Sequence, residues 1–379
     1  MDVKIGRGLE GAIAATSKIG YVNGQKGWLV YAGYNCFDLA QHSTYEETAF
    51  LLLYGKLPTS KELSDFSAKL VRHRSIPESV VEVMRHLPVK EAHPMGILRT
   101  AVSAAGNFAS DSDNVSVDAE REVSIQLIAE FPTIVAAIGR IRQGKDPIAP
   151  NPDLGHAANF LYMLTGEVPD EDAARVMDVA LILHADHGMN ASTFTTMVVN
   201  ATLSDMYSSV VAGIGSLKGS LHGGANERVL YQLEEIGKPE NTLAWFKEAQ
   251  KNKVKVMGMG HRVYKAYDPR GRIFGPLAGL VSDRDPDVAR LYEVAKEVDR
   301  VVSGELKDKK IYPNVDFYSG LVYKALGIET PLFTPIFAVS RVAGWTARAL
   351  EHLADNRLFR PRAIYTGETE LDYRPISER

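Results

Sequence analysis

The chain has 379 residues, which is enough for two or three domains and a sizeable core. With 45% hydrophobic and 24% charged residues, its composition is typical of a globular protein and excludes a mainly disordered, fibrous or low-complexity chain. The 43 Lys and Arg against 47 Asp and Glu give a net charge of −4, so no protein-wide positive field for nucleic acid or an anionic membrane is expected. The single cysteine, Cys36, excludes an internal disulfide framework and a thiolate-rich metal site.

Two features of the sequence bear on localisation. The segment from Met1 to Arg7 lacks the basic-then-apolar layout of a signal peptide. The longest charge-free run, Gly188 to Ser204, is rich in Asn, Ser and Thr and falls short of the roughly 18 apolar residues that a membrane span needs. We therefore expect a soluble, cytoplasmic protein with no membrane partner.

The first predicted elements are a short strand and a helix with a defined start. Gly27 to Tyr31, followed by Gly33, is the best candidate for a hairpin strand. Thr59 and Glu62 have the spacing of a capping box, which predicts a helix that begins there. Alternating patterns are scarce elsewhere, so strands are not expected to build the core.

The later segments have helical spacing. From Asp170, apolar residues recur at intervals of three and four as far as His187, which places them on one face of a helix. Thr334 and Pro335 begin another helix, which carries Trp345. The pattern as a whole predicts an all-α fold.

Three segments place an ionisable residue among glycines or aromatic residues. They are Leu221 to Glu227 around His222, Met257 to Lys265 around His261, and Tyr312 to Tyr318 around Asp316. Glycine beside histidine allows a ligand to approach the backbone closely, although each segment alone could be an ordinary turn. Several lysines and arginines lie near His261 in the sequence, and they could bind a polyanion or form a solvated helix face. They are Lys251, Lys253, Lys255, Arg262, Lys265, Arg270 and Arg272.

Arg341 interrupts an apolar segment that runs from Phe333 to Trp345. An unpaired buried charge costs several kcal/mol, so a guanidinium in this setting needs an anion. Two alternatives stay open, a structural ion pair with a carboxylate of the protein and a carboxylate of a bound ligand.

His184 and His187 have a spacing that could suggest a zinc site. No His-Glu-x-x-His motif and no nearby third ligand accompany them, so we reject this interpretation and expect no metal. His187 is then either a packed core histidine or a donor that points into a buried site.

In order along the chain, these segments resemble the signatures of the citrate synthases, in particular the short form of many bacteria and archaea. The resemblance runs from Gly8 to Pro361 and rests on Ser220 to Glu227, Met257 to Lys265, Asp268 to Arg270 and Pro313 to Tyr318. It implies a mostly helical fold of two domains and an acyltransferase of the tricarboxylic acid cycle. A large domain from residues 1–218 and 322–379 would carry a small domain, residues 219–321, that closes on substrate.

The resemblance also implies roles for single residues. Asp316 is the base and His222 the hydrogen-bond donor that together enolise acetyl-CoA, while His261 faces the carbonyl of oxaloacetate. The carboxylates of oxaloacetate would be held by residues of both domains and by one residue from the partner subunit of a homodimer. These residues are His187, Arg270, Arg341 and, from the partner, Arg360.

For the second substrate, the resemblance implies a loop that recognises the adenine of CoA and a lysine that meets its phosphates. The loop consists of Val256, Met257, Gly258, Met259 and Gly260, and the lysine is Lys265. Acetyl-CoA is a co-substrate, and no permanently bound cofactor is expected.

Two alternatives remain beside citrate synthase. The near one is 2-methylcitrate synthase, which uses propionyl-CoA, because one methylene changes selectivity by only about 1–3 kcal/mol and the motifs do not report it. The distant one is a non-catalytic homologue that binds CoA esters, which the presence of His222, His261 and Asp316 disfavours.

Overall fold

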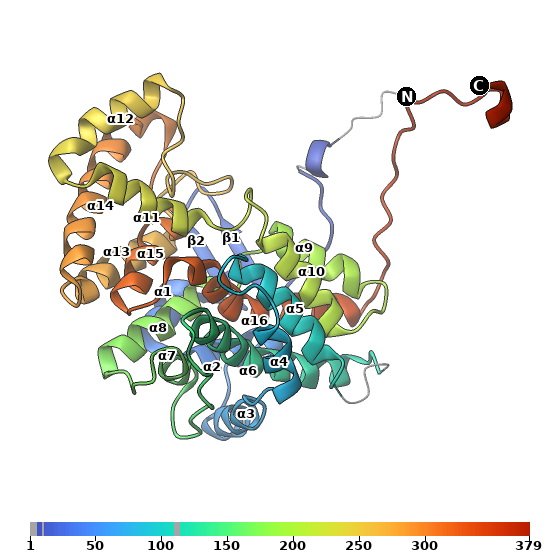
Figure 1. Cartoon of the computed structure of the whole chain (residues 1–379), viewed down its shortest axis with the longest axis horizontal. Helices are drawn as coiled ribbons and strands as arrows, with labels where there is room; N and C mark the ends of the chain where they lie inside the picture. Colours follow the sequence, from blue (N-terminus) through green and yellow to red (C-terminus); the bar gives the residue numbers. More distant parts are fainter. Residues whose placement is uncertain (1–5, 10, 110–113) are drawn as a thin grey trace.

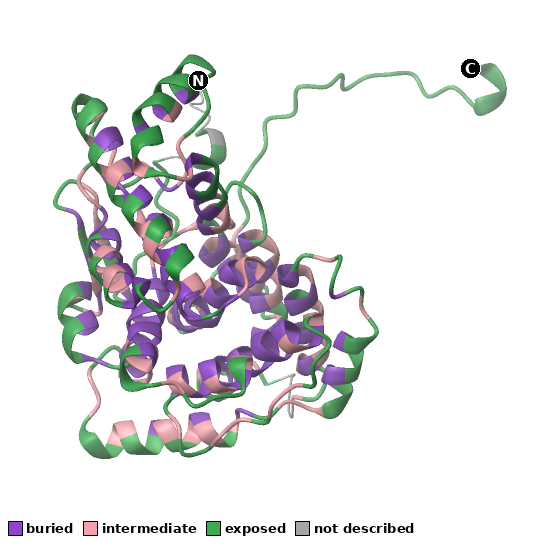
Figure 2. Ribbon diagram, turned by 60° about the vertical axis from the view of Figure 1, so that its left-hand side comes forward, coloured by how far each residue is buried: buried purple, intermediate pink, exposed green. Residues whose placement is uncertain are grey.

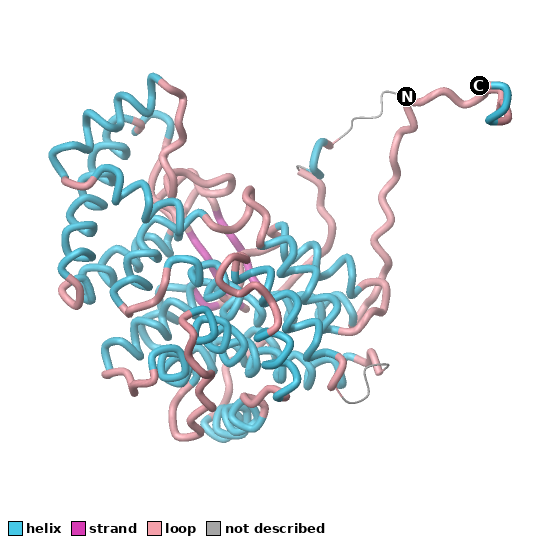
Figure 3. Tube along the Cα trace, in the orientation of Figure 1, coloured by secondary structure: helices cyan, strands magenta, loops and turns pink. Residues whose placement is uncertain are grey.

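The computed structural model describes residues 6–9, 11–109 and 114–379. Residues 1–5, on which the expectation of no leader partly rests, lie outside the described residues. The described part of the chain is built almost entirely of helices, as predicted (Figure 1 and Figure 3).

The α-helices are α1 (Cys36–His42), α2 (Tyr45–Tyr54), α3 (Ser60–Arg72), α4 (Glu78–Arg85), α5 (Pro94–Gly106), α6 (Val117–Arg142), α7 (His156–Thr165), α8 (Glu171–His184), α9 (Ala191–Asn200), α10 (Met206–Leu217), α11 (Ala225–Ile236), α12 (Thr242–Lys251), α13 (Pro269–Ser282), α14 (Pro286–Glu305), α15 (Val315–Ala325) and α16 (Phe333–Leu353). Short 3₁₀ turns lie at Arg7–Leu9, Pro239–Asn241, Lys307–Lys309, Thr330–Leu332 and Ile376–Glu378.

A small antiparallel sheet has the order β1-β2-β3. It consists of β1 (Gly20–Asn23), β2 (Trp28–Tyr31) and β3 (Tyr34–Asn35), with Gly20 opposite Tyr31. The strand predicted from Gly27 to Tyr31 is confirmed as β2. The turn between β1 and β2 reaches residues 263–267, where the Lys265 N–H donates to the carbonyl oxygen of Gly24 at 2.9 Å.

Two long apolar helices, α6 and α16, pack on each other at the centre of the molecule. By length and composition α6 could cross a membrane, but 83% of its most apolar window is buried inside the protein, as in the core helix of a soluble protein. Around this pair, α16 also contacts α2, α8, α9 and α10. We call this part of the molecule, with β1 to β3 and α1 to α10, the body.

Helices α11 to α15 pack on one another beside the body, and we call them the α11–α15 lobe. They lie at the upper left of Figure 1, and α13 joins them to the body through contacts with α1 and α8. Figure 2 shows buried residues in the helices of both parts and a fully exposed C-terminal segment that leaves the body.

Helix starts follow the local chemistry of the sequence. The predicted capping box is confirmed at the start of α3, where the Thr59 N–H donates to Glu62 at 2.8 Å and the Glu62 N–H donates to the Thr59 hydroxyl at 3.3 Å. The helix predicted after Asp170 is α8, and Asp170 caps it. The helix predicted at Thr334 and Pro335 is α16, which begins one residue earlier.

The expected extension of α8 as far as His187 is wrong. The helix ends at His184, and Gly188, four residues later, has a left-handed φ of 62°. Asp186 is held outside the helix by a buried two-point ion pair with Arg348 of α16, both at 2.7 Å, and it accepts a hydrogen bond from the Gly188 N–H. His187 is therefore presented by a turn and not by a helix face.

This turn requires a close approach between α16 and the residues after α8. A Cβ added at Gly344 would lie 2.1 Å from the carbonyl oxygen of Ala185, a rigid backbone atom. We expect Gly344→Ala to lower the free energy of unfolding by at least about 2 kcal/mol, because backbone must shift in a close-packed core. Urea unfolding at one fixed protein concentration measures this change.

Gly304→Ala is the matched control for this stability prediction. Gly304 lies within α14 with nothing within 4 Å of an added Cβ, so alanine should leave stability unchanged or raise it by up to about 1 kcal/mol. Equal effects of the two substitutions would contradict the packing argument.

Candidate active site

His222 lies in the turn between α10 and α11, and its ring is anchored on the first turn of α9. The Ser192 N–H donates to His222 Nε2 at 3.2 Å, and the Ser192 hydroxyl, which accepts from Trp345 Nε1 at 3.0 Å, lies 2.7 Å from the same nitrogen. A backbone N–H can only donate, so Nε2 accepts and a neutral ring carries its proton on Nδ1. Burial, together with the charge of Arg341, lowers the His222 pKa to about 4, so the ring is neutral at pH 7.

His261 is locked in the opposite tautomer. Its Nδ1 accepts from the backbone N–H groups of Val263 at 3.0 Å and Tyr264 at 3.3 Å, which places the proton of the neutral ring on Nε2. Burial, together with the charge of Arg270, lowers the His261 pKa to about 4. Both histidines therefore have one nitrogen fixed by backbone and one N–H left to donate.

The loop before His261 is paired with the segment before Asp316. The Asn314 N–H donates to the carbonyl oxygen of Gly258 at 2.9 Å, and its side-chain amide donates to that of Gly260 at 2.9 Å. Gly258 has a φ of 71°, and a Cβ added there would lie 2.6 Å from a valine side chain. The glycines are thus required for this pairing, which holds His261 and Asp316 on adjoining segments.

Asp316 lies in the first turn of α15, and its backbone N–H donates to the capping side chain of Asn314 at 2.9 Å. No hydrogen bond to its carboxylate is formed within the described part of the chain. Burial raises the Asp316 pKa to about 6, although the charges of Arg270 and Arg341 oppose this rise. The carboxylate is therefore a stronger base than an exposed aspartate and is still mostly ionised at pH 7.

Arg341 is 1% exposed and has no ion pair among the residues that the structure describes. Its Nε donates to the carbonyl oxygen of His184 at 2.5 Å, its guanidinium lies 4.4 Å from the ring centre of Phe337, and its Nη2 is buried without a hydrogen-bond partner. Burial lowers the Arg341 pKa to about 10, so the group remains charged. A structural ion pair, the first of the two alternatives for Arg341, is not found.

Arg270, at the start of α13, is equally buried but is paired. Asp268 accepts from its Nε at 3.0 Å and from its Nη2 at 2.8 Å, and this carboxylate outweighs the effect of burial and raises the Arg270 pKa. The charge of Arg270 acts on His187, His261 and Asp316.

The charge of Arg341 acts on His187, His222 and Asp316. Six of the residues singled out in the sequence therefore share one electrostatic neighbourhood, in which the two arginines are buried and the other four side chains are half-buried. It joins residues of the body to residues of the α11–α15 lobe.

His187 faces the lobe. Its Nε2 lies 3.1 Å from the hydroxyl of Tyr264, and its ring is 5.2 Å from that of His261. Burial and the charge of Arg270 hold the His187 pKa well below its usual value, so the ring is neutral.

His184 points elsewhere. Its Nδ1 donates to the carbonyl oxygen of Ala180 at 2.8 Å, and its ring packs on Phe274 and Phe337. His184 is thus a fully buried histidine that is packed in the core.

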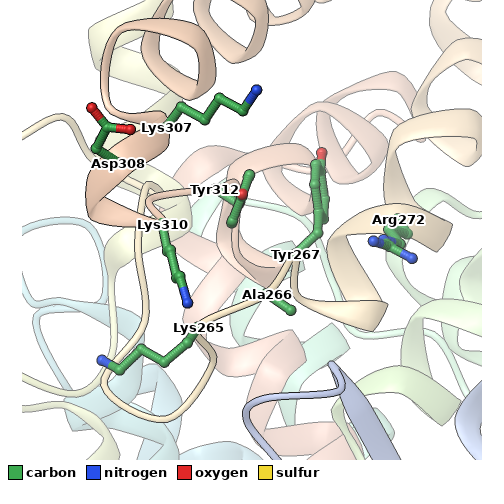
Figure 4. A pocket seen from close by; sticks show the side chains of 8 residues that line it. All are labelled: Lys265, Ala266, Tyr267, Arg272, Lys307, Asp308, Lys310 and Tyr312. Carbon is green, nitrogen blue, oxygen red and sulfur yellow. The ribbon is translucent and has the colours of Figure 1, made fainter.

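A cavity of about 590 Å³ opens on the lobe, at the segment that follows Tyr264. Figure 4 shows three lysines, an arginine and two tyrosines around it, together with one acidic side chain. The lining residues are Lys265, Ala266, Tyr267, Arg272, Lys307, Asp308, Lys310 and Tyr312. The cavity thus has more positive than negative side chains and has aromatic walls, which suits a ligand that contains both phosphate groups and a ring.

The remaining predicted residues are placed as follows. Val256 to Gly260 form the loop that pairs with Asn314, and Lys265 lines the cavity. Arg360 is exposed and forms no hydrogen bond or ion pair within the described part of the chain, and the C-terminal segment leaves the body (Figure 1).

Sequence reasoning missed several residues that shape the site. Ser192 of α9 fixes His222, and Trp345 of α16 fixes Ser192 in turn; no local pattern reports such contacts. Lys307 and Lys310 belong to a visible Lys-Asp-Lys-Lys run, which could have drawn attention to a positively charged wall.

Comparisons with known proteins identify the family of this chain. The family model described as citrate synthase, C-terminal domain, matches residues 8–362. The chain is 47% identical over 375 residues to a citrate synthase of Deinococcus radiodurans, and the match covers 99% of each chain. A 2-methylcitrate synthase of Mycobacterium tuberculosis is 41% identical over 370 residues, which cover 97% of this chain and 92% of that protein.

Solved structures show the same fold. The crystal structure of citrate synthase from Pyrobaculum aerophilum superposes with a TM-score of 0.93 at 44% identity, covering 99% of this chain and 95% of that chain. Citrate synthase from Thermoplasma acidophilum, in a ternary complex with carboxymethyl coenzyme A and oxaloacetate, superposes with a TM-score of 0.94 at 36% identity, covering 99% and 100%. The chain belongs to the citrate synthase family, and it is an acyltransferase of the class that forms a carbon–carbon bond.

Proposed function

We propose that the protein condenses acetyl-CoA with oxaloacetate and water to give citrate and CoA. The observation that carries this proposal is the buried guanidinium of Arg341, whose Nη2 has no partner within the described chain and whose charge acts on two neutral histidines, His187 and His222, and on Asp316. A dicarboxylate substrate supplies the missing anion. The relatives named citrate synthase, and the solved complex with oxaloacetate and a CoA analogue, support this choice.

Asp316 is the proposed base that removes a proton from the methyl group of acetyl-CoA. An ordinary aspartate, with a pKa near 3.9, is a weak base for this step, and burial improves it by raising the pKa to about 6. His222 donates its Nδ1–H to the thioester oxygen as negative charge develops there. A preorganised donor of this kind contributes ~3 kcal/mol to stabilising the transition state.

The enol or enolate then attacks the ketone of oxaloacetate. His261 donates its Nε2–H to the ketone oxygen, and Arg270 adds positive charge beside it. Because backbone donors fix the tautomers of both histidines, neither ring has to rearrange as charge develops. Both reacting carbonyl groups are thus polarised before the new bond forms.

The carboxylates of oxaloacetate are held by Arg341, Arg270 and His187 and by Arg360 of the partner subunit. Planar guanidinium groups bind carboxylates at two points and therefore fix which face of the ketone is presented. Oxaloacetate is thus contacted by residues of two domains, the small domain (residues 219–321) and the large domain (residues 1–218 and 322–379). We therefore expect the small domain to close over the large one when oxaloacetate binds.

Acetyl-CoA binds against the closed small domain. The loop from Val256 to Gly260 recognises the adenine through its backbone, and Lys265, which lines the positively charged cavity, meets the phosphates. A soluble enzyme with these metabolite substrates and no resident cofactor fits a cytoplasmic homodimer of the tricarboxylic acid cycle.

The nearest alternative is 2-methylcitrate formation from propionyl-CoA, which the relative from Mycobacterium tuberculosis keeps open. Thiol release from acetyl-CoA and from propionyl-CoA, each measured with oxaloacetate, separates the two. We expect kcat/KM for acetyl-CoA to exceed that for propionyl-CoA. The reverse order would assign 2-methylcitrate synthesis, and no oxaloacetate-dependent release from either would leave a non-catalytic CoA-ester-binding protein.

Asp316→Asn provides the inactive control in this assay, since an amide keeps the shape but cannot take the methyl proton. We expect kcat to fall by orders of magnitude while oxaloacetate binding stays nearly intact. Asp283→Asn, at an exposed carboxylate of the lobe, should leave activity unchanged. Activity of Asp316→Asn within tenfold of the unsubstituted enzyme would remove Asp316 from the role of base.

A shared active site can be tested by mixing two inactive chains. Asp316→Asn and Arg360→Ala each disable every site of their own homodimer. In a mixed dimer, one site receives an intact Arg360 from the first chain and an intact Asp316 from the second, so activity should return to about half of wild type per dimer. If mixed dimers verified by mass show no recovery, Arg360 acts within its own subunit or not at all.

A further inference from the structure

His187 differs from the other two histidines of the site in what fixes its ring. The rings of His222 and His261 are held by backbone N–H groups, which every substitution except proline leaves in place. The ring of His187 is held by a side chain, the hydroxyl of Tyr264, at 3.1 Å from Nε2. No role in the site has so far been given to Tyr264.

Tyr264 is central to the cluster. It is 2% exposed, and its ring lies 4.9 Å from the ring of His261 and 5.5 Å from that of His187. Its backbone N–H donates to His261 Nδ1 at 3.3 Å, and the next residue, Lys265, is tied to the β1–β2 turn through Gly24. The hydroxyl is therefore carried by a segment that is fixed on both sides.

The direction of the His187–Tyr264 hydrogen bond follows from counting donors. The Tyr264 hydroxyl keeps its proton, because burial raises the pKa of Tyr264. Within the described chain, His187 Nε2 is the only hydrogen-bond partner of this hydroxyl. If Nε2–H donated to the phenol oxygen, the phenol proton would be buried without an acceptor, which costs about 1–3 kcal/mol. The hydroxyl therefore donates, Nε2 accepts, and a neutral His187 carries its proton on Nδ1.

We propose that Tyr264 is a positioning residue that fixes His187 as the Nδ1–H tautomer, so that this N–H donates to a carboxylate of oxaloacetate. The inference rests on the proposed function, in which His187 binds oxaloacetate. It makes Tyr264 a determinant of oxaloacetate affinity that never touches the reacting atoms. All three site histidines then follow one rule, with one nitrogen accepting from a fixed donor and the other presenting its proton to substrate.

Tyr264→Phe tests the proposal because it keeps the ring and removes only the hydroxyl. We expect the oxaloacetate Kd, measured by calorimetry, and the oxaloacetate KM to rise about tenfold, the size of one well-placed hydrogen bond. We expect kcat and the acetyl-CoA KM to stay within threefold. Tyr207→Phe is the matched control, since its buried hydroxyl bonds Glu130 at 2.8 Å within the body and should leave all of these constants unchanged.

A double-mutant cycle with His187→Ala separates this role from a general structural one. If the hydroxyl acts through His187, adding Tyr264→Phe to His187→Ala should change the oxaloacetate Kd by less than twofold. A further tenfold loss in that background, or a change below twofold in Tyr264→Phe alone, would overturn the proposal.

The tautomer itself can be read in the free enzyme by ¹⁵N spectroscopy of protein labelled in its histidines, with the His187 signals assigned by their loss in His187→Ala. We expect Nδ1 of His187 to be protonated and Nε2 unprotonated, and we expect Tyr264→Phe to mix the two forms. A protonated Nε2 in the unsubstituted enzyme would contradict the inference. This measurement of the tautomer needs no oxaloacetate. An enzyme that fails to bind oxaloacetate at all would therefore count against the proposed function, and that result could be told apart from a failure of the tautomer proposal.

Discussion

A guanidinium that is buried without a carboxylate is the constraint around which this site is organised. Arg270 and Arg348 are just as deep in the protein, but each forms a two-point ion pair, with Asp268 and Asp186. Arg341 has only the carbonyl oxygen of His184 for its Nε, at the negative end of α8. That partial charge holds the guanidinium in place without neutralising it, so the edge that carries Nη2 stays available for a substrate anion.

The positive charges of this cluster also determine the state of the histidines. Burial, helped by Arg270 and Arg341, keeps His187, His222 and His261 neutral. A neutral ring can donate from only one nitrogen, and the structure decides which one by placing a donor against the other. Burial acts in the opposite sense on Asp316, where it strengthens a base. One low-dielectric environment thus produces neutral donors and a basic carboxylate next to each other.

Much of this arrangement could be predicted from the sequence, where local chemistry decides the structure. The capping box at Thr59 and the strand that ends at Tyr31 depend on neighbouring residues and were predicted correctly. The end of α8 was not, because the Asp186–Arg348 ion pair that holds the turn joins residues 162 positions apart. Tyr264 was missed for the same reason, since its contact with His187 exists only when the lobe meets the body.

The claim that Arg341 binds a substrate carboxylate is tested most directly by the free energy of unfolding of Arg341→Met, measured with and without oxaloacetate. An unpaired buried charge costs several kcal/mol, so replacing it by an apolar side chain should leave the variant alone at least as stable as the unsubstituted enzyme. Oxaloacetate should stabilise the unsubstituted enzyme but not the variant. A variant that loses about 3–5 kcal/mol, as when one partner of a buried ion pair is removed, and is still stabilised by oxaloacetate would contradict this account.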